Sequence, residues 1–223
     1  MQDIFITWII SNNTSYINNQ SYTVKIDQYF SRGWEIFNQY PGGFIGYLIL
    51  TSVISIIAYI LPAPFGNRGG DTVGIVNFVL NPIFSAGFYI VALQIAKNRP
   101  KDFSDFFRGF NQFIQIFLEH LVGFILVGIG FAFFIIPGIY LAVAYGFSTI
   151  FVIEKKLSFW SALEASRKLI TKKWFSFLGF FLQLVLLNLG GLLLVGIGLF
   201  VTIPLSTCII IAAFEDIAGL YGV

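Results

Sequence analysis

The chain has 223 residues, of which 57% are hydrophobic and only 11% are charged, and its formal net charge is +2. An average soluble domain carries roughly 25% charged residues, so this composition excludes a soluble globular domain. It also excludes a disordered chain, which is polar and charged, and a nucleic-acid binder, which has a strongly basic surface. With a mean hydropathy of +0.83, the chain is expected to be an all-α membrane protein that crosses the bilayer several times.

The first 21 residues are polar and rich in asparagine, unlike the rest of the chain. We expect residues 1–21 to form a mobile leader and residues 22–223 to form a single polytopic membrane domain. The chain has one histidine and one cysteine, which excludes a histidine-cluster metal site and an internal disulfide. Cys208 lies in an apolar run and is predicted to be a buried or lipid-facing thiol. We expect no catalytic site, no metal and no cofactor.

Three amphipathic segments alternate with long apolar runs. Their apolar residues recur at the spacing of one helical face. These stripes are Ile26, Tyr29, Phe30 and Trp34; then Phe103, Phe106, Phe107, Phe110 and Phe113; then Phe159, Leu163 and Ile170. Asp105 is predicted to lie away from the second stripe, and Ser158 to cap the third helix.

The apolar runs predict about six transmembrane helices, since roughly 20 residues cross the hydrocarbon core. The predicted spans are residues 42–61, 73–96, 114–136, 139–153, 175–201 and 204–220. We expect a kink or break at Asn81-Pro82 and a tight hairpin turn at Pro137-Gly138. Spans four and six are short, so the sequence leaves open whether they cross fully.

Each amphipathic segment with the following pair of spans forms a unit, and the units are predicted to be tandem repeats. Their approximate limits are residues 22–96, 102–153 and 157–220. The pentapeptide LVGIG occurs at 126–130 and again at 194–198, with Gly123 and Gly191 at the same offset. Small residues at these positions favour close packing of helices over a ligand cradle.

The basic residues predict the orientation of the chain. Twelve of the 13 Lys and Arg residues lie in the segments before spans one, three and five, and only Arg68 lies on the opposite side. Because basic loops stay in the cytoplasm, both termini and all three amphipathic segments are expected to be cytoplasmic.

Four polar residues within the spans are candidates for function, namely Glu119, His120, Asn81 and Asn188. An ionisable residue inside a membrane is a functional candidate, and Glu119 with His120 would suit proton relay. The alternative is an interfacial Glu119 paired with a cytoplasmic cation. As helix neighbours, Glu119 and His120 are expected to point about 100° apart, which is poor for joint action. The two asparagines either line a path or bond neighbouring helices.

The third amphipathic segment carries four basic residues beside two tryptophans. Arg167, Lys168, Lys172 and Lys173 are candidate contacts for lipid headgroups, with a preference for anionic lipid. The alternative is that all three amphipathic segments are caps packed on the helix bundle. No buried charges are expected to pair, which argues against an ion-coupled pump.

From residue 22 onward the chain resembles an uncharacterised family of bacterial integral membrane proteins. The likeness rests on SRGWEIF at 31–37, IIPGIYLAV at 135–143, LSFWSAL at 157–163 and TIPLS at 202–206. The same residues are similar to the membrane domain attached to some glycerophosphodiester phosphodiesterases, whose catalytic domain is absent here. The resemblance implies a multi-pass protein of the bacterial cytoplasmic membrane and carries no agreed activity.

These features predict a non-enzymatic membrane protein that acts as an accessory subunit, a scaffold or an organiser of lipid. The alternative is a small-molecule or lipid transporter or channel, since tandem repeats also occur in transporters. Membrane lipids are the expected partners, and a membrane-protein partner or a second copy of the chain is left open. Nucleic acid is not an expected partner.

Overall fold

The computed structural model describes residues 22–60, 69–194 and 196–220, and this part of the chain is helical throughout. The predicted leader 1–21 lies outside the described residues, as does most of the loop between the first two spans. The elements are α2 (Ile26–Asn38), α3 (Pro41–Ile60), α4 (Gly69–Ala96), η2 (Phe103–Gln112), α5 (Phe113–Phe133), α6 (Ile135–Ala144), α7 (Ser148–Lys155), α8 (Phe159–Thr171), α9 (Trp174–Leu193) and α10 (Leu199–Ala218).

The chain is an all-α protein with enough apolar helix to cross a membrane several times. Five described segments are long and apolar enough for this: Phe78–Ala96, Phe103–Phe133, Ile135–Lys155, Trp174–Leu193 and Leu199–Ala218. The α2 helix and the apolar start of α3 meet at an 83° bend, and together they count as a sixth. The predicted class, about six membrane-spanning segments in an all-helical chain, is therefore confirmed.

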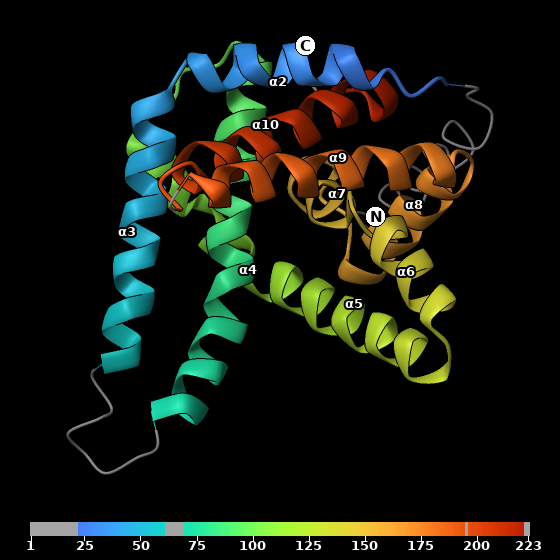
Figure 1. Cartoon of the computed structure of the whole chain (residues 1–223), viewed down its shortest axis with the longest axis horizontal. Helices are drawn as coiled ribbons and strands as arrows, with labels where there is room; N and C mark the ends of the chain where they lie inside the picture. Colours follow the sequence, from blue (N-terminus) through green and yellow to red (C-terminus); the bar gives the residue numbers. More distant parts are fainter. Residues whose placement is uncertain (1–21, 61–68, 195, 221–223) are drawn as a thin grey trace, which may run out of the picture.

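A short helix precedes an apolar hairpin three times along the chain. The short helices are α2, η2 and α8, and the hairpins are α3–α4, α5–α6 and α9–α10. In Figure 1 the hairpins point in different directions: α3–α4 runs downward, α5–α6 ends at the lower right, and α9–α10 lies across the middle. The helix α2 lies along α10, so the first and last described elements are neighbours.

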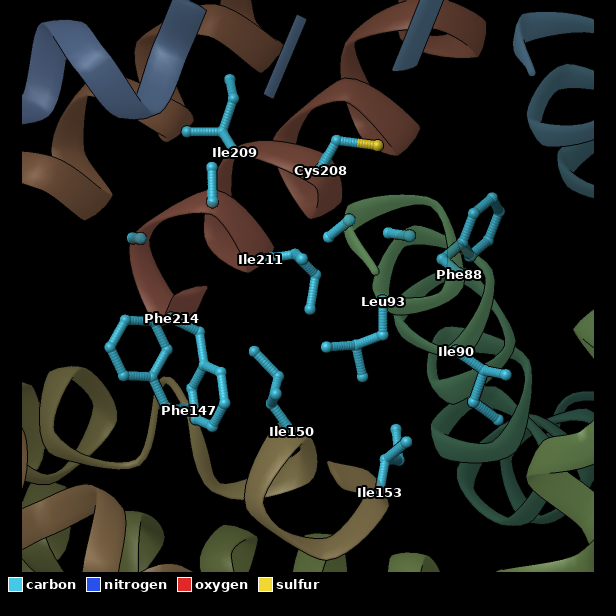
Figure 2. Packing of buried hydrophobic residues seen from close by; sticks show 14 of the residues in the cluster. Phe88, Ile90, Leu93, Phe147, Ile150, Ile153, Cys208, Ile209, Ile211 and Phe214 are labelled. Atoms are coloured by element: carbon cyan, nitrogen blue, oxygen red, sulfur yellow. The ribbon is translucent and has the colours of Figure 1, made fainter. Parts of the chain in front are cut away.

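The core forms where α4, α7 and α10 converge. Figure 2 shows Leu93 of α4, Ile150 of α7 and Ile211 of α10 pointing into one space, with Phe214 and Phe147 beside them. All five side chains are at most 3% exposed. Cys208 of α10 is also fully buried, which confirms its predicted place. Aliphatic and aromatic side chains of α4, α7 and α10 thus hold together helices that are far apart in sequence.

The helices α5 and α9 leave broad apolar faces uncovered by the protein. Only 17% of the apolar window in Phe103–Phe133 and 22% of that in Trp174–Leu193 is buried. Exposure is high at the hairpin ends, where Ile136 is 79% and Leu193 is 85% exposed. Contiguous apolar surface of this extent indicates contact with lipid or another membrane protein.

The second short helix, η2, differs from the sequence prediction in the type of helix and in the face that it buries. It is a 3₁₀ helix, so every third residue shares a face. Phe106 and Gly109 lie on that face and are buried, whereas Phe107 and Phe110 are 37% and 42% exposed. Asp105, predicted to lie away from the packed stripe, is only 3% exposed because it completes a capping box with Asp102.

The hairpin turns also fall elsewhere than predicted. The chain turns at Phe134, which is extended, and Pro137 lies in the first turn of α6, where proline is tolerated. The next turn lies between α9 and α10, and Pro204, predicted to begin a span, lies inside α10. Likewise α4 continues through Pro82 without a break. Helix ends predicted from the positions of the prolines are therefore wrong.

The predicted span 139–153 is interrupted between α6 and α7. Ser166 of α8 bridges the gap, since its hydroxyl donates to Ala144 O at 2.7 Å and accepts from Phe147 N at 3.1 Å. These bonds satisfy backbone groups that a continuous helix would have paired internally. A hydroxyl distant in sequence therefore stabilises a break that the apolar run does not reveal.

The repeated pentapeptide adopts two conformations. Residues 126–130 are α-helical within α5, whereas 194 and 196–198 form the turn between α9 and α10. Gly196 has φ +77°, a value that glycine adopts readily. Identical sequence thus lies at different places in the two hairpins, and the predicted equivalence of these glycines is wrong.

Close helix approach occurs at three of the glycines that were predicted to favour close packing, Gly130, Gly191 and Gly198. A Cβ on Gly191 would lie 2.5 Å from Thr202 Oγ1, and one on Gly198 would lie 2.6 Å from Gly191 O. A Cβ on Gly130 would lie 3.0 Å from Gly138 Cα. Both hairpins are therefore closed by small residues near their turns, as the sequence predicted.

Candidate functional site

Glu119 belongs to α5, faces α7 and is 4% exposed. Its Oε1 is within hydrogen-bond distance of Ser148 Oγ, and Thr149 Oγ1 donates to its Oε2 at 3.1 Å. Within 4 Å of its carboxyl group, the described part of the chain supplies one basic group, His120, and no lysine or arginine. The expected pairing with a cytoplasmic cation is therefore wrong.

His120 is much nearer to Glu119 than the sequence predicted. Its Nδ1 lies 2.8 Å from Glu119 Oε2, although neighbours on a helix start 100° apart. The two atoms are not aligned for a hydrogen bond, and Nδ1 has no hydrogen-bond partner among the described residues. The imidazole thus touches the carboxyl group, and 37% of its side chain remains exposed.

Two pockets flank α4 and share Asn81 and Ser85. The α4–α5 pocket has a volume of about 420 Å³ and is also lined by His120. The α3–α4–α10 pocket, of about 480 Å³, contains Asn81 and Ser85 together with Tyr89. The structure therefore brings Asn81 and His120, two of the predicted residues, to one pocket.

The α3–α4–α10 pocket contains more hydroxyl groups than the sequence analysis anticipated. Thr51, Ser52 and Ser55 of α3 and Thr207 of α10 line it. Thr51 and Ser55 donate to carbonyl oxygens of their own helix, at 3.1 and 3.0 Å. In the sequence, Thr51 and Ser55 lie four residues apart in an otherwise apolar segment, and this spacing is the signal that could have identified them. Thr51 lies ten residues into the 20-residue α3, or about 15 Å along its axis, near the middle of this apolar helix.

Asn81 and Ser85 have no hydrogen-bond partner from the described protein, although both line the two pockets. Polar groups without a partner are expensive in an apolar helix that crosses a membrane, and Phe78–Ala96 is apolar enough to do so, which favours a polar occupant of the pockets. A neutral polar group or water inside these pockets would satisfy them.

Asn188 lies elsewhere, between α9 and α10. Its Nδ2 donates to Leu184 O and to Ser206 Oγ, both at 2.8 Å. Ser206 donates in turn to Thr202 O at 2.7 Å. Asn188 therefore bonds the two helices of the third hairpin, the second of the two roles that the sequence left open.

All four predicted headgroup residues are at least partly exposed, and two of them pair with Glu164. Arg167 Nε and Nη2 donate to the two carboxyl oxygens of Glu164, each at 2.8 Å, and Lys168 Nζ lies 3.4 Å from Glu164 Oε1. The hydrogen bond from Arg167 lowers the pKa of Glu164 below its usual value and raises that of Arg167. Lys172 and Lys173 are exposed where α8 meets α9.

A buried ion pair was not anticipated and contradicts the expectation of no paired buried charges. Lys97 Nζ, at the end of α4, lies 2.6 Å from Glu154 Oε1 of α7, and both side chains are less than 10% exposed. The two residues are far apart in sequence and each follows an apolar run. Only their position at the ends of predicted spans could have suggested that they meet.

Polar contacts join the ends of α2, α7 and α10. Tyr29 Oη donates to Asp216 Oδ2 at 2.9 Å, and burial raises the pKa of Tyr29 to about 12. Arg32 Nε donates to Glu215 Oε2 at 3.2 Å. Lys155 Nζ donates to Gly219 O at 2.9 Å. The start of the described chain and its end therefore meet at one polar junction.

Gln94 of α4 holds η2 against α4. With its amide oriented to satisfy both neighbours, its nitrogen donates to Asp105 Oδ2 at 2.9 Å and its oxygen accepts from Arg108 Nη1 at 3.1 Å. Arg108 also pairs with Asp105 at 2.7 Å. Gln94 is thus a structural residue at the edge of the bundle.

No group of three or more His, Cys, Asp or Glu side chains is placed to hold a metal ion within the described ranges. Comparison with protein-family models, with curated proteins and with solved structures gave no match for the chain. The resemblance to the membrane domain of glycerophosphodiester phosphodiesterases therefore stays a prediction from the sequence segments that carry it.

Proposed function

We propose that this chain is a non-enzymatic protein of the bacterial cytoplasmic membrane that organises anionic lipid at the cytoplasmic leaflet. The non-enzymatic role and the bacterial membrane rest on the sequence and its resemblance alone. A cytoplasmic location of both termini is supported by the polar junction, where α2 meets the ends of α7 and α10 through Tyr29, Lys155 and Asp216. The excess of basic residues on this side supports the same orientation.

The junction of α8 and α9 is the observation on which the lipid role depends. Lys172 and Lys173 are exposed there, and Phe175, two residues after Lys173, is 82% exposed. Trp160 of α8 is 57% exposed. Cationic side chains beside exposed aromatic rings suit the boundary between headgroups and acyl chains. Anionic headgroups would be attracted to the two lysines.

The apolar hairpin ends support a role in arranging lipid. The turn between α9 and α10 is apolar, and its backbone bonds internally, with Gly196 N donating to Leu192 O at 3.0 Å and Leu199 N to Gly196 O at 3.1 Å. A turn that satisfies its own backbone can lie in hydrocarbon, where water is absent. Splayed hairpins of this kind would displace acyl chains beneath the short helices.

The test is lipid binding by the purified full-length protein. Native mass spectrometry in mixed phosphatidylglycerol and phosphatidylethanolamine nanodiscs would measure the preference for the anionic lipid. Each lysine near an anionic surface contributes about 1 kcal/mol, so the Lys172→Gln, Lys173→Gln variant should lose roughly 30-fold of that preference. Removing Arg99 and Lys101 in the same way is the matched control, with a smaller loss expected. An unchanged preference in the first variant would refute the proposal.

A transporter is the second candidate, because the two pockets beside α4 share unpaired polar groups at membrane depth. Vesicles that contain the protein should then pass a small polar solute, and Asn81→Leu should abolish this flux. Absence of flux in the wild-type protein would remove this candidate and leave the lipid role.

A further inference from the structure

The hydroxyl of Ser148 has two acceptors but a single proton. Ser148 Oγ lies 2.6 Å from Tyr145 O and within hydrogen-bond distance of Glu119 Oε1. A carbonyl oxygen and an ionised carboxylate only accept, so an ionised Glu119 would leave one of these two contacts without a proton. If Glu119 is protonated, its Oε1 donates to Ser148 Oγ, and Ser148 donates to Tyr145 O. Both contacts are then hydrogen bonds.

The alternative is an imidazolium paired with an ionised carboxylate. His120 Nδ1 is close enough at 2.8 Å, but a proton on Nδ1 would not point at Glu119 Oε2. That oxygen already accepts from Thr149 Oγ1. A charged pair in a poor geometry does not offset the loss of hydration on burial. The proton therefore fits Glu119 better than His120.

The groups around Glu119 do not supply a positive charge. From α4, the Tyr89 phenol lies within coulombic range of the carboxyl group, and α7 contributes the hydroxyls of Ser148 and Thr149. The α6 helix has no charged residue, and in η2 Asp105 and Arg108 pair with each other. On α8, Glu164 likewise pairs with Arg167. A neutral acid is the form that suits such a site.

We propose that Glu119 is a proton-binding site within the membrane, which holds its proton against Ser148 and exchanges it with the α4–α5 pocket through His120. His120 touches Glu119 and lines that pocket, so it is the group through which the proton can leave. Transfer begins when the carboxyl group and the imidazole turn so that the acid proton faces His120 Nδ1, because the two groups are not aligned for a hydrogen bond in this structure. One proton then moves from the carboxyl group to the imidazole, which releases it to water in the pocket. The carboxylate left behind competes with Tyr145 O for the proton of Ser148, which weakens the contact between α5 and α7. This inference is independent of the lipid role.

Infrared spectroscopy of the full-length protein in lipid vesicles tests the protonation. A protonated carboxylic acid has a carbonyl band separate from those of carboxylates and amides, and this band shifts in D₂O. We expect the band in the wild-type protein and its loss in Glu119→Gln, whose amide can still donate to Ser148. Replacing the other buried pair, as Lys97→Met with Glu154→Gln, is the matched control and should leave the band in place. An unchanged spectrum in Glu119→Gln would overturn the proposal.

Two further variants test the partners of the proton. Ser148→Ala removes the acceptor of the Glu119 proton, so the band should move to the higher frequency of a weaker hydrogen bond. His120→Leu should slow the deuterium shift of the band at least tenfold, whereas Leu121→Ala, which alters another wall of the same pocket, should not slow it. An exchange rate unaffected by His120→Leu would overturn the role of His120, and an unmoved band in Ser148→Ala would overturn the assignment of the donor.

Discussion

Glu119 of α5 contacts the start of α7, and Glu154 lies near the end of α7. Both carboxyl groups are buried, yet their surroundings differ. At the end of α7, Glu154 lies 2.6 Å from the ammonium group of Lys97. At its start, Ser148 and Thr149 offer Glu119 hydroxyl groups, with an imidazole at 2.8 Å. One short helix therefore takes part in a charged pair and in a network without a full positive charge.

The difference teaches how a membrane protein can tolerate acids in its interior. Removing a charge from water costs several kcal/mol, which a close opposite charge offsets in part. Without such a charge, the acid avoids the cost by keeping its proton. The two glutamates differ in the partner that they meet rather than in their depth of burial, since both are about 5% exposed at the side chain.

The largest expected effect follows from breaking the charged pair. Lys97→Met would leave Glu154 buried without the ammonium group that lies 2.6 Å away, at a cost of about 3–5 kcal/mol in unfolding free energy. The measurement is reversible unfolding of the detergent-solubilised protein by denaturant. Replacing both residues, as Lys97→Met with Glu154→Met, should restore most of the stability because no charge is then left buried. If Lys97→Met alone were as stable as the wild-type protein, the prediction that Lys97 and Glu154 form a buried charged pair would be wrong.

A smaller effect is expected from removing the other acid. Glu119→Leu leaves Ser148 donating to Tyr145 O at 2.6 Å, and only the partly buried Thr149 hydroxyl loses its acceptor. An unpaired hydroxyl costs about 1–3 kcal/mol, so the loss should lie at the low end of that range. Glu154→Leu, measured in the same denaturant series, should cost more because it leaves the Lys97 charge behind. Equal losses for the two leucine variants would contradict the distinction between these sites.

Sequence patterns predicted the class, the number of apolar spans and the limits of α3 because these depend on local composition. The face of η2 was mispredicted because a 3₁₀ helix has a period of three, which the spacing of its five phenylalanines does not reveal. The break between α6 and α7 depends on Ser166, and the pair of Lys97 with Glu154 joins two hairpins. Such contacts arise only when distant segments fold together. Asn81 and His120 were identified as candidates, but their shared pocket required the structure.

The smallest effect on stability is expected from the exposed pair of Glu164 and Arg167, which serves as the exposed counterpart of the buried Lys97–Glu154 pair. Its side chains are 35% and 37% exposed, so the pair should contribute less than about 1 kcal/mol. Because Arg167 lowers the pKa of Glu164, the contribution is present above the usual glutamate value of about 4.3 and is lost as the pH falls through the lowered value in the folded state. Thermal unfolding at neutral and acidic pH should differ less in Glu164→Gln than in the wild type.

Added salt should weaken the exposed pair of Glu164 and Arg167 but leave the Lys97–Glu154 pair nearly unchanged, since water and ions reach only the first. Equal sensitivity of the two pairs to salt would mean that Lys97 and Glu154 are solvated in the membrane-bound protein.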